Sequence, residues 1–230
     1  MILARVTNRT GLAVACLLLA CAGFPATPEA PRVLQAPVWV YAERVPGSSG
    51  AEDVVNDAPP LDRLDSVSRF VLSGMVYGWK FSYVPYDKKR GVAEEFSLEP
   101  LAEIAADDPR FAILHLKPSY PRLLCVAEYS LDDSHARWIT HWDSTVFRTS
   151  KGRGSGERVD ETNGIRAAYA GAIRSAIREH ARKLEKNKPK EVTGEVLLRE
   201  NPRLFPDEGR FVAEVRVLIN VREVVPYRSF

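Results

Sequence analysis

Residues 210–225 read RFVAEVRVLINVREVV, and the alternation within this stretch decides the fold class. Apolar and polar residues take turns over most of its length, which is the pattern of a strand with one buried and one wet face. The polar side includes Glu214 and Arg216. The apolar side consists of Phe211, Ala213, Val215, Val217, Ile219 and Val221. The stretch therefore predicts a long strand that lines a hydrophobic core.

A long helix is predicted upstream, over residues 160–186, and a further strand at 190–199 connects it to the terminal strand. Asp160 to Asn163 supply capping and acidic residues, which favour a helix start. Apolar residues then recur at helical spacing. They are Ile165, Ala168, Ala172, Ile173, Ala176, Ile177 and Leu184.

The first half of the chain predicts shorter elements. A helix from Leu61 is expected to stop at Ser73-Gly74. Residues 75–86 alternate as a strand, with an aromatic side formed by Met75, Tyr77, Trp79, Phe81 and Tyr83. The other elements expected from the pattern are strands at 38–41, 111–117, 121–131 and 136–149 and one short helix within the acidic stretch 94–108.

The pattern predicts an α+β fold, a mainly antiparallel sheet of about six to eight strands with one short and one long helix. Short turns between consecutive strands favour antiparallel pairing. Asp132-Asp133-Ser134-His135 is expected to be the turn of a hairpin formed by the strands around it. Residues 150–157, SKGRGSGE, are expected to be a mobile connector, because their glycine spacing matches neither a P-loop nor a dinucleotide-binding loop.

Composition places the chain among ordinary globular proteins. It has 230 residues, of which 45% are hydrophobic and 27% charged. With 32 basic and 30 acidic residues, no overall charge points to a nucleic-acid partner. No metal or cofactor motif stands out, so no cofactor is expected. Cys125 lies in an apolar run and is expected to be a small buried residue.

The first residues are typical of an export signal. They read MILARVTNRTGLAVACLLLACAG, with Arg5 and Arg9 followed by an apolar run from Gly11 to Ala20. That run has the length of a signal-peptide core and is too short to span a bilayer. Leu18-Leu19-Ala20-Cys21 resembles the lipobox of bacterial lipoprotein precursors. The resemblance implies cleavage before Cys21, acylation of its thiol and attachment to a membrane.

The expected organisation is a signal peptide over 1–20, a lipid-anchor cysteine with a proline-rich tether over 21–36 and a single domain over 37–230. Two alternatives remain. Ala20-Cys21-Ala22 also fits an ordinary signal peptidase, which would release a soluble protein. The apolar run would otherwise be the buried first helix of a cytosolic domain.

Two candidate binding surfaces stand out. Arg174, Arg178 and Arg182 repeat every four residues along the long predicted helix. Like charges at this spacing repel each other, so they favour an anionic partner. Membrane lipid, another envelope protein or the acidic 94–108 segment would each serve. Tyr77 and Trp79 of the aromatic strand would form either a binding platform or part of the core.

A cluster of acids and histidines around 132–143 is the best candidate for chemistry. His141 and Asp143 would share one face of the predicted strand and would be the residues of an exported hydrolase. The wet face of an antiparallel hairpin is the simpler interpretation of these residues, and it is the one that the sequence favours. The function expected from the sequence is therefore a lipid-anchored, non-catalytic binding or assembly protein of the bacterial envelope, facing the periplasm or the surface. A hydrolase and a soluble periplasmic binding module are the alternatives.

Overall fold

The computed structural model describes residues 32–43, 58–144, 146–184 and 188–227. The predicted signal peptide, Cys21 and the first part of the expected tether lie outside these ranges. The described ranges contain nine strands and three helices. The helices are α1 (Pro60–Val76), α2 (Asp133–Trp142) and α3 (Glu161–Leu184). The strands are β1 (Val33–Tyr41), β2 (Trp79–Val84), β3 (Glu95–Pro100), β4 (Phe111–Ser119), β5 (Arg122–Ser130), β6 (Arg148–Glu157), β7 (Glu191–Leu198), β8 (Arg203–Asp207) and β9 (Arg210–Val225).

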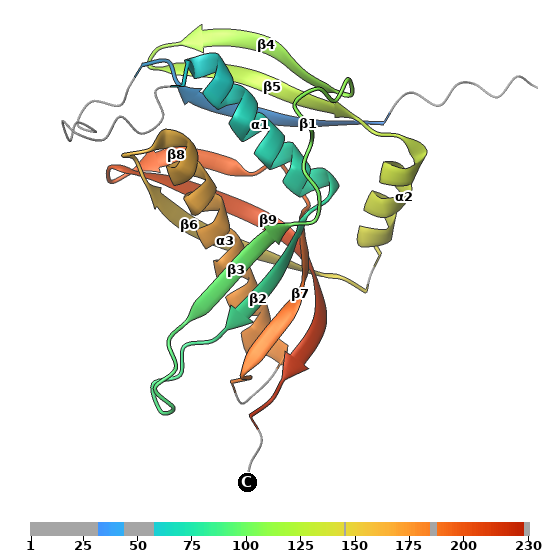
Figure 1. Ribbon diagram of the computed structural model, residues 1–230, viewed down its shortest axis with the longest axis vertical. Helices are drawn as coiled ribbons and strands as arrows, with labels where there is room; N and C mark the ends of the chain where they lie inside the picture. Colours follow the sequence, from blue (N-terminus) through green and yellow to red (C-terminus); the bar gives the residue numbers. More distant parts are fainter. Residues whose placement is uncertain (1–31, 44–57, 145, 185–187, 228–230) are drawn as a thin grey trace, which may run out of the picture. The chain divides into compact units, whose positions relative to one another are not determined.

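The strands form two antiparallel sheets, which confirms the α+β class. One sheet has the order β1-β5-β4. The other has the order β3-β2-β7-β9-β6, and β8 pairs with the first part of β9. The fold class agrees with the prediction, but the strands form two sheets rather than one. Helices pack between the two sheets and join them. Figure 1 shows the smaller sheet beside α1 and the larger sheet beside α3.

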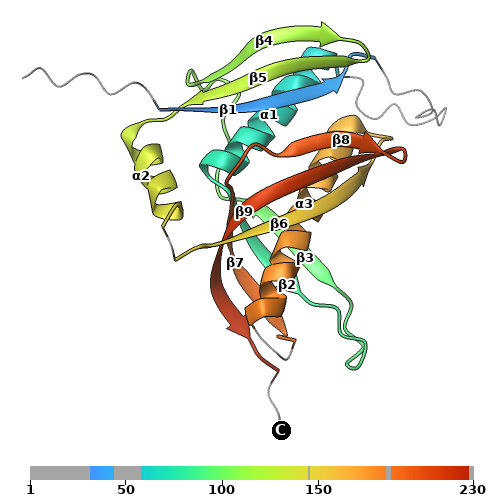
Figure 2. The same cartoon turned by 180° about the vertical axis from the view of Figure 1, so that it is seen from behind.

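The terminal strand β9 is the centre of the larger sheet, as its alternation predicts. Its apolar side, including Phe211, Val217 and Ile219, lies in the main core together with the apolar side of α3. β7 pairs with its C-terminal half and β6 with its N-terminal half. Figure 2 shows β9 and β6 from the side of the sheet opposite α3.

The glycine-rich segment 150–157 is a strand, so the prediction of a mobile connector is wrong. It forms most of β6 and pairs with β9 along its length. Gly152, Gly154 and Gly156 all face α3, where a Cβ atom would overlap the helix backbone. The three glycines therefore let the strand lie directly against the helix, which a larger residue would prevent.

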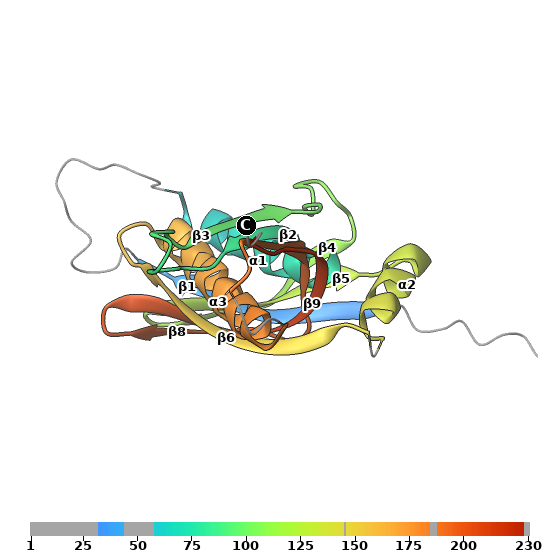
Figure 3. The same cartoon turned by 90° about the horizontal axis from the view of Figure 1, so that it is seen from below.

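The predicted hairpin is also wrong in its second half. β5 ends at Ser130, and α2 follows at Asp133 in place of the strand expected over 136–149. Asp132 is the N-cap of this helix and accepts hydrogen bonds from the backbone N–H groups of Ser134 and His135. Trp142 is buried on Leu197 and Leu218 of the larger sheet. Figure 3 shows α2 apart from α1 and α3.

Helix α1 begins at Pro60, close to the predicted start, but continues through Ser73-Gly74 to Val76. The expected stop is wrong because Gly74 serves packing: a Cβ there would overlap the ring of Trp79. Met75 therefore belongs to the helix and Tyr77 to its C-cap, and the aromatic strand is shortened to β2. The turn to β2 uses Gly78, whose φ of 79° suits glycine.

Three further elements differ from those that the sequence pattern predicts. β1 begins at Val33 rather than at Val38, so the end of the expected tether segment, with Ala36 fully buried, is part of a strand. The acidic stretch 94–108 contains the strand β3 in place of the expected short helix. β8 carries Pro206 and was not expected from its pattern.

Candidate functional site

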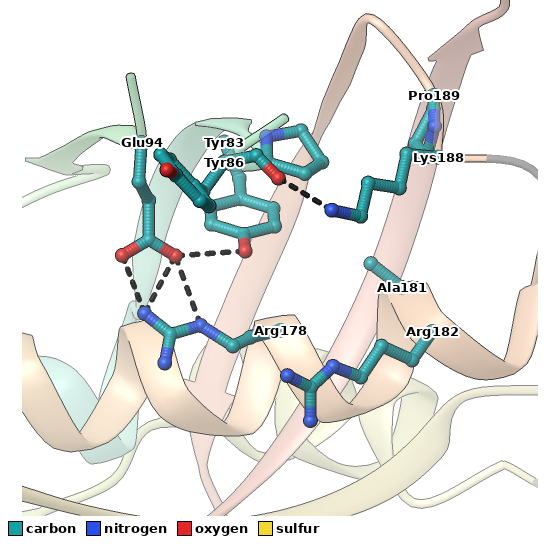
Figure 4. Close-up of a pocket in the computed structure, with 9 residues that line it drawn as sticks. Tyr83, Tyr86, Glu94, Arg178, Ala181, Arg182, Lys188 and Pro189 are labelled. Atoms are coloured by element: carbon teal, nitrogen blue, oxygen red, sulfur yellow. Dashed lines mark hydrogen bonds and ion pairs between the residues drawn. The ribbon is translucent and has the colours of Figure 1, made fainter. Parts of the chain in front are cut away.

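A cavity of about 600 Å³ lies at the C-terminal end of α3, between this helix and the residues that follow β2. Its volume falls within the usual range for small-molecule sites. Figure 4 shows the residues around it, which come from segments far apart in the sequence. The lining residues are Tyr83, Pro85, Tyr86, Glu94, Arg178, Ala181, Arg182, Lys188 and Pro189.

The apolar part of the cavity is formed by rings. Tyr83 is buried at the end of β2, because alternation in that strand turns it toward the core. Tyr86 is 56% exposed, so one of its surfaces is available to a ligand. Pro85 and Pro189 add two rigid rings, and the small side chain of Ala181 leaves room on the helix side. Such surfaces change little in conformational freedom when a ligand covers them.

A charged hydrogen-bond group closes one side of the cavity. Arg178 donates to Glu94 Oε1 from Nε at 2.9 Å and from Nη2 at 2.6 Å. Tyr83 donates its hydroxyl to the same oxygen at 2.9 Å. Because two side chains share one carboxylate, this group fixes the turn before β3 against α3, as drawn in Figure 4.

The pKa values of Glu94 and Tyr83 are shifted in opposite directions, each away from neutral pH. Burial would raise the pKa of Glu94, but the hydrogen bonds from Arg178 and Tyr83 outweigh it and lower the pKa. Burial, followed by the hydrogen bond to Glu94, raises the pKa of Tyr83. Glu94 therefore stays ionised and Tyr83 protonated, which suits binding better than proton transfer near neutral pH.

Two further cations stand at the rim of the cavity. Lys188 donates to the backbone carbonyl of Tyr86 at 2.8 Å, and its Nζ lies 5.9 Å from the centre of that ring. A carbonyl carries no charge, so this bond does not neutralise the ammonium. Arg182 pairs with Glu179 at 2.7 Å, but both side chains are about half exposed or more, so water weakens the pair.

The predicted arginine row is thus only partly assembled at the site. Arg178 and Arg182 line the cavity, whereas Arg174 is exposed one turn earlier. Arg178 has an intramolecular partner in Glu94, from the acidic segment that the sequence offered as one alternative. The position of Arg174 still matters, since its charge helps to lower the pKa of Glu94.

Tyr77 and Trp79 do not form an exposed platform. Trp79 is 3% exposed, with its ring against Gly74 and Phe70. Tyr77 is half-buried and uses its hydroxyl in contacts with Tyr129 and His135. The structure therefore assigns both to the core, which was the other interpretation of the aromatic strand.

The acid and histidine cluster separates into two places. One half forms a closed group of contacts that we call the polar ring. Tyr77 Oη lies 3.2 Å from both Tyr129 Oη and His135 Nε2, and Tyr129 donates to Asp108 at 3.0 Å. Arg110 donates to the carboxylates of Asp108 and Asp132, each at 2.9 Å. The members are Tyr77, Asp108, Arg110, Tyr129, Asp132 and His135.

The polar ring is a structural group. Tyr129 at its centre is fully buried, and burial raises the pKa of its hydroxyl. The hydrogen bond from Arg110 lowers the pKa of Asp108 to about 2. Hydrogen bonds from Ser134 and from the backbone of His135 lower the pKa of Asp132. Because the charges of these groups are fixed, the hydrogen bonds of the polar ring hold the start of α2 against the end of α1 and β5.

The other half of the cluster lies at the end of α2. His141 is exposed and stacks on Trp138, with ring centres 6.2 Å apart. Asp143 is half exposed and pairs with Arg199 at 3.2 Å. Neither residue lines the cavity, and their shared strand face does not exist because the segment is helical. The structure therefore removes the argument that made them a catalytic pair.

The remaining sequence predictions concern Cys125 and ligands. Cys125 is 4% exposed beside Ser68, and burial raises the pKa of its thiol, which confirms a small buried residue. Within the described ranges, no group of three or more His, Cys, Asp or Glu side chains is placed to hold a metal ion. No helix of those ranges has the length and apolar character needed to cross a bilayer.

Comparison with known proteins places the chain in a family. A protein-family model matches residues 21–227. An uncharacterised protein of Treponema pallidum (strain Nichols) is 40% identical over 194 residues, which cover 84% of this chain and 82% of that protein. The chain belongs to this family. No solved structure matches it.

Sequence reasoning missed most of the cavity. The sequence pattern places Tyr83 only in the aromatic strand and gives no individual signal for Tyr86, Glu94 or Lys188. The signal that pointed here was the arginine spacing along α3, because it predicted an acidic partner. Which acid would meet Arg178 depends on a contact between residues 84 positions apart.

Proposed function

We propose that this chain is a lipid-anchored protein of the bacterial envelope with a non-catalytic binding role, and that the cavity at the end of α3 is its binding site. The observation that carries this proposal is the cavity itself. Its volume is about 600 Å³, ring surfaces form its walls and charged groups converge on its rim. That combination is typical of ligand sites.

The charge states in the cavity favour binding over catalysis. Glu94 accepts hydrogen bonds from Arg178 and Tyr83, so its carboxylate is already committed. Its lowered pKa makes it a weak base, and the raised pKa of Tyr83 makes that hydroxyl a weak acid. Groups that exchange protons in catalysis usually have pKa values near the working pH.

The membrane anchor rests on the first residues of the chain. The apolar run that ends at Leu18-Leu19-Ala20-Cys21 has the length and the final cysteine of a lipoprotein signal. Removing residues 1–20 also removes Arg5 and Arg9, which leaves equal numbers of basic and acidic residues.

Metabolic labelling with a clickable fatty acid tests the anchor. We expect the wild-type chain to carry the label and to sediment with membranes. Cys21→Ser should abolish both, while Cys16→Ser, the matched control within the same signal, should leave both unchanged. Two or more acyl chains would make the attachment stable, because one chain alone binds only marginally. Unlabelled wild-type protein in the soluble fraction would instead support the secreted alternative.

A further inference from the structure

We propose that the cavity binds a sugar ring that carries a carboxylate, which names the ligand class of the proposed function and rests on it. An acidic saccharide matches the two features that the cavity offers, a flat rigid surface and a positively charged rim.

The charge at the rim is positive after internal pairing. Among the described lining residues, the single carboxylate is Glu94, and it is bound by Arg178. Among the described residues, Lys188 contacts the carbonyl and the ring of Tyr86 but no carboxylate, and Arg182 is weakly paired in water. Two cations from either side of the cavity thus remain to meet an anion. Arginine and lysine both donate charge-assisted hydrogen bonds to carboxylates.

The walls favour a ring as the body of the ligand. Tyr86 exposes more than half of its surface, and Pro85 and Pro189 stand beside it. Figure 4 shows Tyr86 and Lys188 on the same side of the cavity, opposite Arg182 on α3. A sugar packed on Tyr86 would bring a ring carboxylate toward these cations. The backbone and tyrosine oxygens nearby suit the hydroxyl groups of a sugar.

Volume and exposure argue against simpler ligands. A cavity of about 600 Å³ is much larger than a phosphate or sulfate ion needs. An acyl chain needs enclosed apolar walls, but Tyr86 and Arg182 are both more than half exposed. A hydrophilic anion that keeps part of its surface in water fits better than either.

Ligand-observed NMR by saturation transfer tests the proposal with the full-length chain in detergent micelles. The probes are D-glucuronate and D-glucose, which differ in the carboxylate. We expect transfer to the ring protons of glucuronate and binding of glucose at least about tenfold weaker, because glucose lacks the charge-assisted contacts. Inorganic phosphate should compete only weakly, since it lacks the ring.

Matched variants locate the site. Arg182→Gln and Tyr86→Ala should each weaken glucuronate binding about tenfold or more. Arg166→Gln, an exposed arginine near the start of the same helix and outside the cavity, and Tyr120→Ala, a tyrosine 80% exposed elsewhere, should leave it unchanged. All four are surface changes, so far-UV circular dichroism should show an unaltered fold.

Three outcomes would overturn the proposal. They are equal binding of glucose and glucuronate, complete displacement of glucuronate by phosphate at equal concentration, and equal effects of Arg166→Gln and Arg182→Gln. None of these depends on acylation, because the protein is measured in micelles. Failure of the lipid label would therefore contradict the anchor alone, and failure of glucuronate binding would contradict the ligand class.

Discussion

The absence of side chains at three glycines of β6 allows this strand to approach α3 closely. At Gly152, Gly154 and Gly156 the helix backbone occupies the space of a Cβ atom. On the helix side, Gly164 meets the carbonyl of Glu157 in the same way. Protein interiors are close-packed, so such a contact cannot absorb even one methyl group without a backbone shift.

Substitution of Gly154 by Ala should therefore destabilise the protein. We expect the free energy of unfolding to fall by about 1–3 kcal/mol or more, because the added Cβ overlaps the backbone nitrogen of Ala172. Urea denaturation followed by tryptophan fluorescence measures the change.

Gly171→Ala is the control on the opposite side of the same contact. A Cβ there would lie 3.4 Å from the Cα of Gly154, an ordinary contact distance. Since alanine favours a helix interior by up to about 1 kcal/mol, this variant should be neutral or slightly stabilised. Equal losses in the two variants would contradict a contact that is tight only at Gly154.

At the scale of elements, α2 illustrates how one residue spacing can satisfy two patterns. Trp138 and Trp142 are separated by four positions, which places them on one face of a strand and also on one face of a helix. The cap at Asp132 favours the helix, because its side chain satisfies two backbone donors. Packing of Trp142 on Leu197 and Leu218 then fixes that helix on the larger sheet.

Trp142→Ala should cost about 3–5 kcal/mol of unfolding free energy, the usual loss for a large buried aromatic residue. Its side chain is almost completely buried, with 1% exposed. His141→Ala, the adjacent control, should change stability by less than about 0.5 kcal/mol because His141 is exposed. Chemical denaturation measures both.

The two results have different consequences. A Trp142→Ala protein as stable as the wild type would contradict the packing of α2 on the larger sheet. A stable His141→Ala protein that no longer complements a deletion strain would contradict the non-catalytic function.

At the scale of the whole molecule, two polar groups join elements that are distant in the sequence. Glu161 at the start of α3 accepts the backbone N–H of Tyr41 at 2.6 Å and pairs with Arg63 of α1. The polar ring joins the end of α1 to β5 and the start of α2. The smaller sheet is therefore linked to both α1 and α3 by buried and partly buried polar contacts, in addition to the common core.

The polar ring should make stability depend on pH in the acid range. Arg110 lowers the pKa of Asp108 from 3.8 to about 2 in the folded protein. A lowered folded-state pKa means that this stabilisation is complete above the unfolded value and is lost as the pH falls through the folded value. The free energy of unfolding should therefore fall between about pH 5 and about pH 2.

Asp108→Asn separates this contribution from general acid denaturation. The variant should be less stable than the wild type at about pH 6, and the difference should narrow toward about pH 2, where about half of the wild-type carboxylate is itself protonated. Asp107→Asn, an exposed neighbour, should follow the wild-type curve. Parallel curves for Asp108→Asn and the wild type would assign the acid sensitivity to other groups.

The sequence alone was sufficient where a segment carries its own periodic pattern. The alternation of 210–225 predicted β9, and the apolar stripe beginning at Ile165 predicted α3. The apolar run around Cys125 likewise predicted a buried residue in a strand. These predictions hold because burial of one face is encoded within the segment, whatever element covers it.

Tertiary structure decided the segments whose pattern is weak or double. The glycines of β6 have no side chains to alternate, and only α3 lying on them explains why they form a strand. The spacing of Trp138 and Trp142 suited both a strand and a helix until Leu197 and Leu218 supplied the surface they bury. The cavity likewise depends on Glu94 meeting Arg178, a contact between segments that no local periodicity can encode.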